Sequence, residues 1–131
     1  MPSRSPLLLL PLLLLACGSS EKTCNLNLVE AALTVVVTDD ANGSCLVGAA
    51  VTATDSRGRV VAINAPNGIG FPTPPCGHYL GLGDNDVQAR SAWTITVMKG
   101  GYATVSVPIT MDHDGCHVVG QSVAVKLTTT P

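Results

Sequence analysis

The feature that most constrains the fold of this chain is a two-residue alternation of apolar and polar side chains. Leu33, Val35 and Val37 fall on one face of an extended strand, and residues 93–98 repeat the pattern. A period of two is typical of half-buried β-strands, whereas an amphipathic helix repeats its apolar residues every three or four positions. Because no stretch of useful length has the helical period, the sequence predicts an all-β domain.

Seven segments are expected to form strands, with turns rich in Asp, Asn and Gly between them. They span residues 33–38, 48–54, 59–63, 79–80, 93–98, 103–109 and 122–127. Lys99-Gly100-Gly101 predicts a hairpin turn, and four prolines within residues 64–90 predict loops there. Pro108 cannot donate a backbone hydrogen bond, so its strand is expected at a sheet edge. Several short alternating strands predict a single β-sandwich.

The first 16 residues have the three parts of a secretory signal peptide, which is removed from the mature protein. Arg4 supplies the positive start, Leu7 to Leu15 form an apolar core, and Ala16 is the small residue before a cleavage point. The alternative is a transmembrane helix, but a bilayer core needs roughly 20 apolar residues, about twice this run. Pro11 would weaken such a helix further. The leader therefore predicts export.

Leu14-Leu15-Ala16-Cys17 resembles the lipobox of bacterial lipoproteins. In that family the Cys thiol receives a diacylglycerol and becomes the new N-terminus; the alternative is an ordinary signal peptide with an incidental Cys. The resemblance implies a signal peptide over residues 1–16, a lipidated Cys17 with a flexible tether over 17–25, and one domain over 26–131. It also implies a cell-envelope protein whose partner is the membrane, to which the lipid on Cys17 anchors it. Because Gly18 is not an Asp, the implied location in a Gram-negative cell is the outer membrane.

The cysteine count agrees with a lipidated Cys17. The chain has five Cys, and assigning one to lipid leaves an even number. The remaining four are Cys24, Cys45, Cys76 and Cys116. In an oxidising compartment they predict two disulfides. Four cysteines allow three pairings, and the sequence alone does not determine which pairing forms. Their spacing contains no C-x-x-C pattern, so a structural zinc site, even with His117 beside Cys116, is the poorer interpretation.

Charge and composition exclude other classes of protein. The formal net charge is −2, and loss of residues 1–16 removes Arg4 and no acid, leaving about −3. Such a chain lacks the basic surface that phosphate backbones require, so no nucleic-acid partner is expected. Aromatic residues make up only 3% of the chain. Trp93, in phase with Ile95 and Val97, is therefore the expected large filler of the core rather than a ligand platform.

The polar residues of the chain match no common catalytic motif. The chain contains neither G-x-S-x-G nor H-E-x-x-H. Its two Glu residues, Glu21 and Glu30, both precede the first clear strand, so the sequence has no His–Glu pair of the kind that holds a carboxypeptidase zinc ion. We therefore expect no enzymatic activity, no catalytic residue and no cofactor.

The loop Asp112–His117 is the strongest alternative site. Asp112-His113-Asp114-Gly115 matches half of a calcium-loop pattern but lacks the rest and the distal Glu. An ordinary Asp/Gly turn is the preferred interpretation. His113 and His117 could bind a transition metal with a neighbouring Asp, although exposed loop histidines are preferred, and Asp84-Asn85-Asp86 is interpreted likewise as a turn. No metal site is predicted, and metal or small-ligand binding by this loop stays the alternative function.

Longer segments resemble a known family. Val35-Val36-Val37-Thr38, an Asp/Gly turn and then Val47-Gly48-Ala49-Ala50-Val51-Thr52 resemble the start of carboxypeptidase-regulatory-like domains. Residues 93–102 resemble their strand that ends in a Gly-Tyr turn, and residues 122–127 resemble their closing strand. The resemblance implies a transthyretin-like, or prealbumin-like, β-sandwich of about seven strands. It implies the accessory domain of that enzyme class, not the catalytic one.

The resemblance carries two further implications. In that fold the first and penultimate strands run parallel in one sheet, so the loops after them lie at the same end; this implies the pairs Cys45–Cys116 and Cys24–Cys76. The function implied is a non-enzymatic envelope module that binds a protein, peptide or glycan through its loops or a sheet edge. A transthyretin-like hydrolase is the alternative, because that fold hosts one, and fold alone decides neither.

Overall fold

The computed structural model describes residues 23–64 and 76–131. The expected signal peptide, the lipidated Cys17 and the loop over 65–75 lie outside the described residues. The strands are β1 (Leu33–Asp39), β2 (Ala50–Asp55), β3 (Val60–Ile63), β4 (His78–Gly81), β5 (Ser91–Met98), β6 (Val105–Met111) and β7 (Gln121–Leu127). Each begins and ends within two residues of an expected strand, and no helix occurs in the described ranges. The all-β prediction is confirmed.

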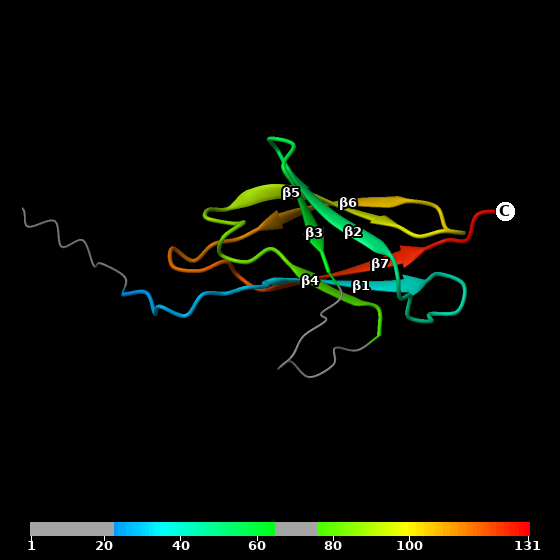
Figure 1. Ribbon diagram of the computed structural model, residues 1–131, viewed down its shortest axis with the longest axis horizontal. Helices are drawn as coiled ribbons and strands as arrows, with labels where there is room; N and C mark the ends of the chain where they lie inside the picture. The colour runs from blue at the N-terminus through cyan, green and yellow to red at the C-terminus, as the bar shows by residue number, and fades with distance from the viewer. Residues whose placement is uncertain (1–22, 65–75) are drawn as a thin grey trace, which may run out of the picture.

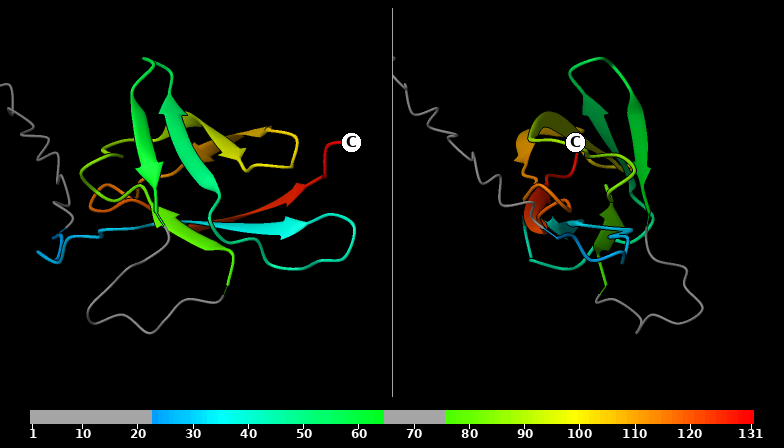
Figure 2. Two further views of the ribbon diagram at one scale, coloured as in Figure 1. Left: turned by 45° about the vertical axis from the view of Figure 1, so that its right-hand side comes forward. Right: turned by 90° about the vertical axis from the view of Figure 1, so that its left-hand side faces the viewer.

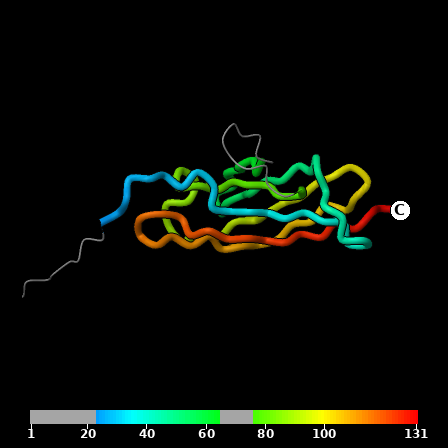
Figure 3. Tube along the Cα trace, turned by 90° about the horizontal axis from the view of Figure 1, so that it is seen from below, coloured from blue at the N-terminus to red at the C-terminus, as the bar shows by residue number. Residues whose placement is uncertain are grey.

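The strands form two sheets packed as a sandwich (Figure 1), ordered β4-β1-β7 and β3-β2-β5-β6. β1 and β7 run parallel and side by side along the molecule (Figure 3), from Leu33 opposite Gln121 to Asp39 opposite Leu127. The other strand pairs are antiparallel. Figure 2 shows β2 and β3 crossing the direction of β1 and β7, as the twist of packed sheets requires.

The alternating residues supply the core between the sheets. Val35 and Val37 from β1 and Ile95 and Val97 from β5 are completely buried, and Trp93 is 3% exposed. Burial of a side chain of this size stabilises the fold by about 1.5–3 kcal/mol relative to exposure. The prediction that Trp93 fills the core in phase with its neighbours is therefore confirmed.

The β5–β6 hairpin has the expected turn and the expected edge. The backbone N–H of Tyr102 donates to the carbonyl of Lys99 at 3.1 Å, and Gly101 takes a φ of 85°, which favours glycine. β6, which contains Pro108, is one of the two edge strands of its sheet. The Tyr102 hydroxyl donates to Oδ2 of Asp39 at 2.8 Å, which lowers the pKa of that carboxyl and ties the hairpin to the end of β1.

The two disulfides join the cysteines differently from the expected pairing. Cys24 is bonded to Cys116, with their Cα atoms 5.2 Å apart, and Cys45 is bonded to Cys76, with their Cα atoms 5.6 Å apart. The prediction of two disulfides is borne out, but the implied pairs Cys45–Cys116 and Cys24–Cys76 are wrong.

Strand order explains this difference. The parallel neighbour of β1 is the last strand, β7, and not the penultimate strand, so Cys116 precedes that neighbour instead of following it. Cys116 consequently lies where β1 begins, beside Cys24. β4 runs antiparallel to β1, so Cys76, which precedes β4, lies where β1 ends, beside Cys45. Each disulfide therefore closes one end of the β4-β1-β7 sheet.

Candidate functional site at the N-terminal end of the domain

The carboxylate of Asp84 joins three segments of the chain at the end where β1 begins. Its Oδ2 accepts the backbone N–H of Val29 at 2.8 Å, and its Oδ1 accepts the backbone N–H of Val118 at 2.8 Å. Oδ2 also lies 2.7 Å from Nδ1 of His117. Residues 84–86 form the expected turn, yet the Asp84 side chain is only 10% exposed. We call Asp84 and the groups that it binds the junction.

His117 is the second member of this junction. Its Nε2 lies 2.9 Å from the side-chain oxygen of Asn25 and 3.2 Å from the Asn25 carbonyl, while Nδ1 faces Asp84. Both ring nitrogens thus face acceptors, an arrangement that suits the imidazolium form, in which both donate. The side chain is 19% exposed, so the expectation of an exposed loop histidine is wrong for His117. Although His117 lies in a loop, its contacts with Asp84 and Asn25, which are distant in sequence, cover most of its side chain.

Hydrogen bonding sets the charge of both groups. The N–H groups of Val118 and Val29, with a further contribution from His117, lower the pKa of Asp84 to about 2 against the opposing effect of burial. The hydrogen bond to Asp84 is the largest cause that raises the pKa of His117. The pair is therefore ionised in weakly acidic solution, between the lowered pKa of Asp84 and the ordinary histidine value of 6.5.

These contacts hold the segment before β1 against the body of the domain. The Cys24–Cys116 bond holds its start, and the backbone N–H of Asp84 donates to the carbonyl of Val29 at 2.8 Å. Gly83 passes so close to the Val29 and Glu30 carbonyls that a Cβ would overlap them. We call this assembly, residues 24–30 with 83–84 and 112–119, the locked end.

The Asp112–His117 loop forms its own turn. Oδ1 of Asp114 accepts the N–H groups of Cys116 and His117, each at 2.8 Å, and Nδ1 of His113 accepts the N–H of Gly115 at 3.0 Å. The Asp/Gly turn prediction is confirmed. Within residues 23–64 and 76–131, no three His, Cys, Asp or Glu side chains converge in an arrangement that could hold a metal ion.

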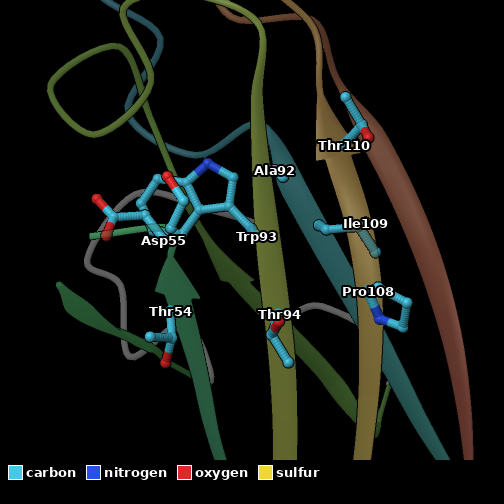
Figure 4. Close-up of a pocket in the computed structure, with 9 residues that line it drawn as sticks. Thr54, Asp55, Ala92, Trp93, Thr94, Pro108, Ile109 and Thr110 are labelled. Carbon is cyan, nitrogen blue, oxygen red and sulfur yellow. The ribbon is translucent and has the colours of Figure 1, made fainter. Parts of the chain in front are cut away.

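Two adjoining hollows lie beside Trp93. The first has a volume of about 450 Å³ and follows the outer face of β2, β5 and β6 (Figure 4), where Thr54, Thr94 and Pro108 lie across the three strands and Asp55 lies by the indole. The second has a volume of about 500 Å³. Its lining includes three arginines and the polar loop over residues 85–91.

Arg59 of the second hollow contacts Trp93, Asp86 and Asp55. Its guanidinium carbon lies 5.3 Å from the centroid of the Trp93 ring, and Nη2 donates to the carbonyl of Asp86 at 2.6 Å. Nε donates to Asp55 at 3.3 Å. Arg57 and Arg90 line the same hollow. The alternation around Trp93 predicts a core residue and gives no sign of this hollow, because Arg59 and Asp86 are 27 residues apart and no local motif links them.

The junction predicts a bell-shaped dependence of stability on pH. The pKa of His117 is raised in the folded protein, so protonated His117 stabilises the fold. This stabilisation is complete below pH 6.5, the ordinary histidine pKa, and is lost as pH rises through the pKa that His117 has in the folded protein. The pKa of Asp84 is lowered in the folded protein, so the ionised carboxylate stabilises the fold. This stabilisation is complete above pH 3.8, the ordinary pKa of an aspartate, and is lost as pH falls towards about 2. Unfolding temperature measured against pH should therefore fall on both sides of this window.

Two variants separate the limbs of that profile. His117→Gln should remove the alkaline limb, and Asp84→Asn should flatten both limbs and lower the unfolding temperature throughout. His113→Gln, in the same loop, is the control and should keep the alkaline limb. An alkaline limb that survives in His117→Gln and disappears in His113→Gln would refute the assignment.

The described strands define a two-sheet, disulfide-bonded β-sandwich. No protein-family model matches the chain, and no curated protein matches it in sequence. Residues 23–64 and 76–131 include no helix with the length and apolar character needed to cross a bilayer.

Proposed function

We propose that this chain is a lipid-anchored, non-enzymatic protein of the bacterial cell envelope. The leader is cleaved before Cys17, which carries the lipid, and the sandwich is displayed outside the cytoplasm. One acyl chain binds a bilayer only marginally, whereas two or more hold a protein almost permanently. In a Gram-negative host the outer membrane is the proposed location.

The observation that carries this proposal is the locked end. Cys24, which lies seven positions after Cys17, is bonded to Cys116. All four cysteines that follow the lipobox form disulfides. Two disulfides fit an exported protein, since disulfides persist in oxidising compartments and are rare in the cytosol. The odd cysteine of the five is the one at the lipobox, where a free thiol is needed for lipid.

The proposed domain type is the transthyretin-like sandwich of carboxypeptidase-regulatory-like domains. Seven strands in two sheets and the Gly101-Tyr102 turn support it, while the parallel neighbour of β1 is the last strand and not the penultimate strand that the resemblance implies. Its proposed role is to bind a peptide, a protein or a glycan. The arginine-lined hollow beside Trp93 offers guanidinium groups for such a ligand, and guanidinium forks suit carboxylate and phosphate groups.

Metabolic labelling with a radioactive fatty acid tests the anchor. The wild-type chain should incorporate label and sediment with membranes, because the thiol of Cys17 accepts the lipid. Cys17→Ser should incorporate none. Globomycin, which blocks lipoprotein signal cleavage, should make the labelled band larger by the mass of residues 1–16. An unlabelled wild-type chain that is released to the medium would refute the proposed anchor.

A further inference from the structure

The locked end exposes apolar side chains that the fold leaves uncovered. Leu26 is fully exposed, and Leu28 and Val119 are 55% and 44% exposed. An exposed leucine alone needs no explanation, but a group of them at one end of a small domain does. The other exposed large apolar residues of the described surface are Val47, Val60 and Met98, which lie outside the locked end.

The structure brings these three residues to one end of the sandwich. The segment 24–29 and the loop 112–119 lie side by side at the same end in each view (Figures 1, 2 and 3). The Cys24–Cys116 disulfide and the hydrogen bonds between His117 and Asn25 hold them there.

The proposed lipid lies a short distance away along the chain. Seven residue steps separate Cys17 from Cys24, and a fully extended chain of that length spans at most about 25 Å. Because Cys24 is covalently fixed to Cys116, the locked end cannot move farther than this from the membrane. It is the end of the domain nearest to the lipid.

We propose that the locked end rests on the bilayer, with Leu26, Leu28 and Val119 inserted between headgroups and acyl chains. This inference rests on the lipid anchor proposed for Cys17. The opposite end, with Cys45–Cys76 and the β5–β6 turn, then points away from the membrane. The lipid and the apolar side chains together hold the sandwich in one orientation, where a flexible tether alone would let it tumble.

The charges around this end indicate which kind of lipid surface it contacts. Glu30, Asp112 and Asp114 are exposed there, and Arg90 is paired with Asp112 at 2.9 Å. The described residues of the locked end include no lysine or arginine, so they provide no basic cluster for anionic headgroups. The contact is therefore apolar and suits a zwitterionic surface, and salt should not weaken it.

Tryptophan quenching by lipids brominated on the acyl chain tests the insertion. The lipidated full-length protein is reconstituted into phosphatidylcholine vesicles that contain the brominated lipid. Trp93 is the single native tryptophan and is buried, so its emission provides the unquenched background. Leu26→Trp should place an indole in the interface, and its added emission should fall about twofold or more. High salt should leave this quenching unchanged.

Val47→Trp is the matched control, because Val47 is 63% exposed and follows Cys45 at the opposite end of β1. Its added emission should be unaffected by the brominated lipid. Equal emission from Leu26→Trp with and without the quencher, in protein that floats with the vesicles, would overturn the insertion and leave the anchor intact. Quenching that salt abolishes would overturn the apolar mode. Protein that fails to float contradicts the anchor and the insertion together.

Discussion

Replacement of Cys24 and Cys116 together by Ala is expected to lower the free energy of unfolding by about 4.6 kcal/mol. The bond spans 92 residues, and a cross-link over so long a loop strongly limits the entropy of the unfolded chain. Domains of this size have total stabilities of about 5–15 kcal/mol. The loss would therefore take a large share of the total, and urea unfolding followed by Trp93 fluorescence measures it directly.

A second double variant provides the comparison. The Cys45–Cys76 bond spans 31 residues, so Cys45→Ala with Cys76→Ala should cost about 1 kcal/mol less, about 3.7 kcal/mol. The Cys24/Cys116 variant should in addition free the segment before β1, which the Cys45/Cys76 variant should leave protected from proteolysis. A loss below about 1 kcal/mol on removal of Cys24–Cys116 would contradict a locked N-terminal segment.

The substitution Ile95→Ala is expected to lower the free energy of unfolding by about 2–5 kcal/mol. Ile95 is completely buried at the centre of β5, opposite Ala53 of β2 and Val107 of β6. Truncation removes buried methylene groups and leaves a cavity that the surrounding strands can fill only in part. The same urea titration reports the change, with the slope of the transition expected to stay constant.

Thr94→Ala is the control for the core substitution. Thr94 is the neighbour of Ile95 on the outer face of the same strand and is exposed. Its replacement should cost less than about 1 kcal/mol, which reflects strand preference rather than packing. Equal losses at the two positions would show that β5 does not present alternate residues to one core.

Local patterns were sufficient to predict the strands. The alternation at Val35 and Ile95 and the Gly-Gly turn before Tyr102 depend on neighbours in the sequence, because a strand exposes every second side chain to the same side. Pro108 predicted an edge for the same kind of local reason. These features are dictated within about ten residues, and the structure contains them at the expected positions.

The partnerships between distant segments could not be predicted in this way. The disulfide pairs follow from which strand lies parallel to β1, and several pairings satisfy the same alternation. Asp84 and His117 are 33 residues apart, and the N–H groups that Asp84 accepts belong to Val118, beside His117, and to Val29 in a third segment. No spacing rule marks such a junction, since its geometry exists only after both sheets have formed.

A mass map of the protein purified from membranes, digested without reduction by trypsin and an Asp-specific protease, tests the central claim most directly. We predict a lipid-modified peptide over residues 17–22, peptide 23–38 joined to 114–126, and peptide 40–54 joined to 60–83. An unmodified Cys17 still preceded by the leader would contradict the lipid anchor. Cys24 joined to Cys45 or Cys76 would contradict the disulfide that links the segment before β1 to the loop before β7.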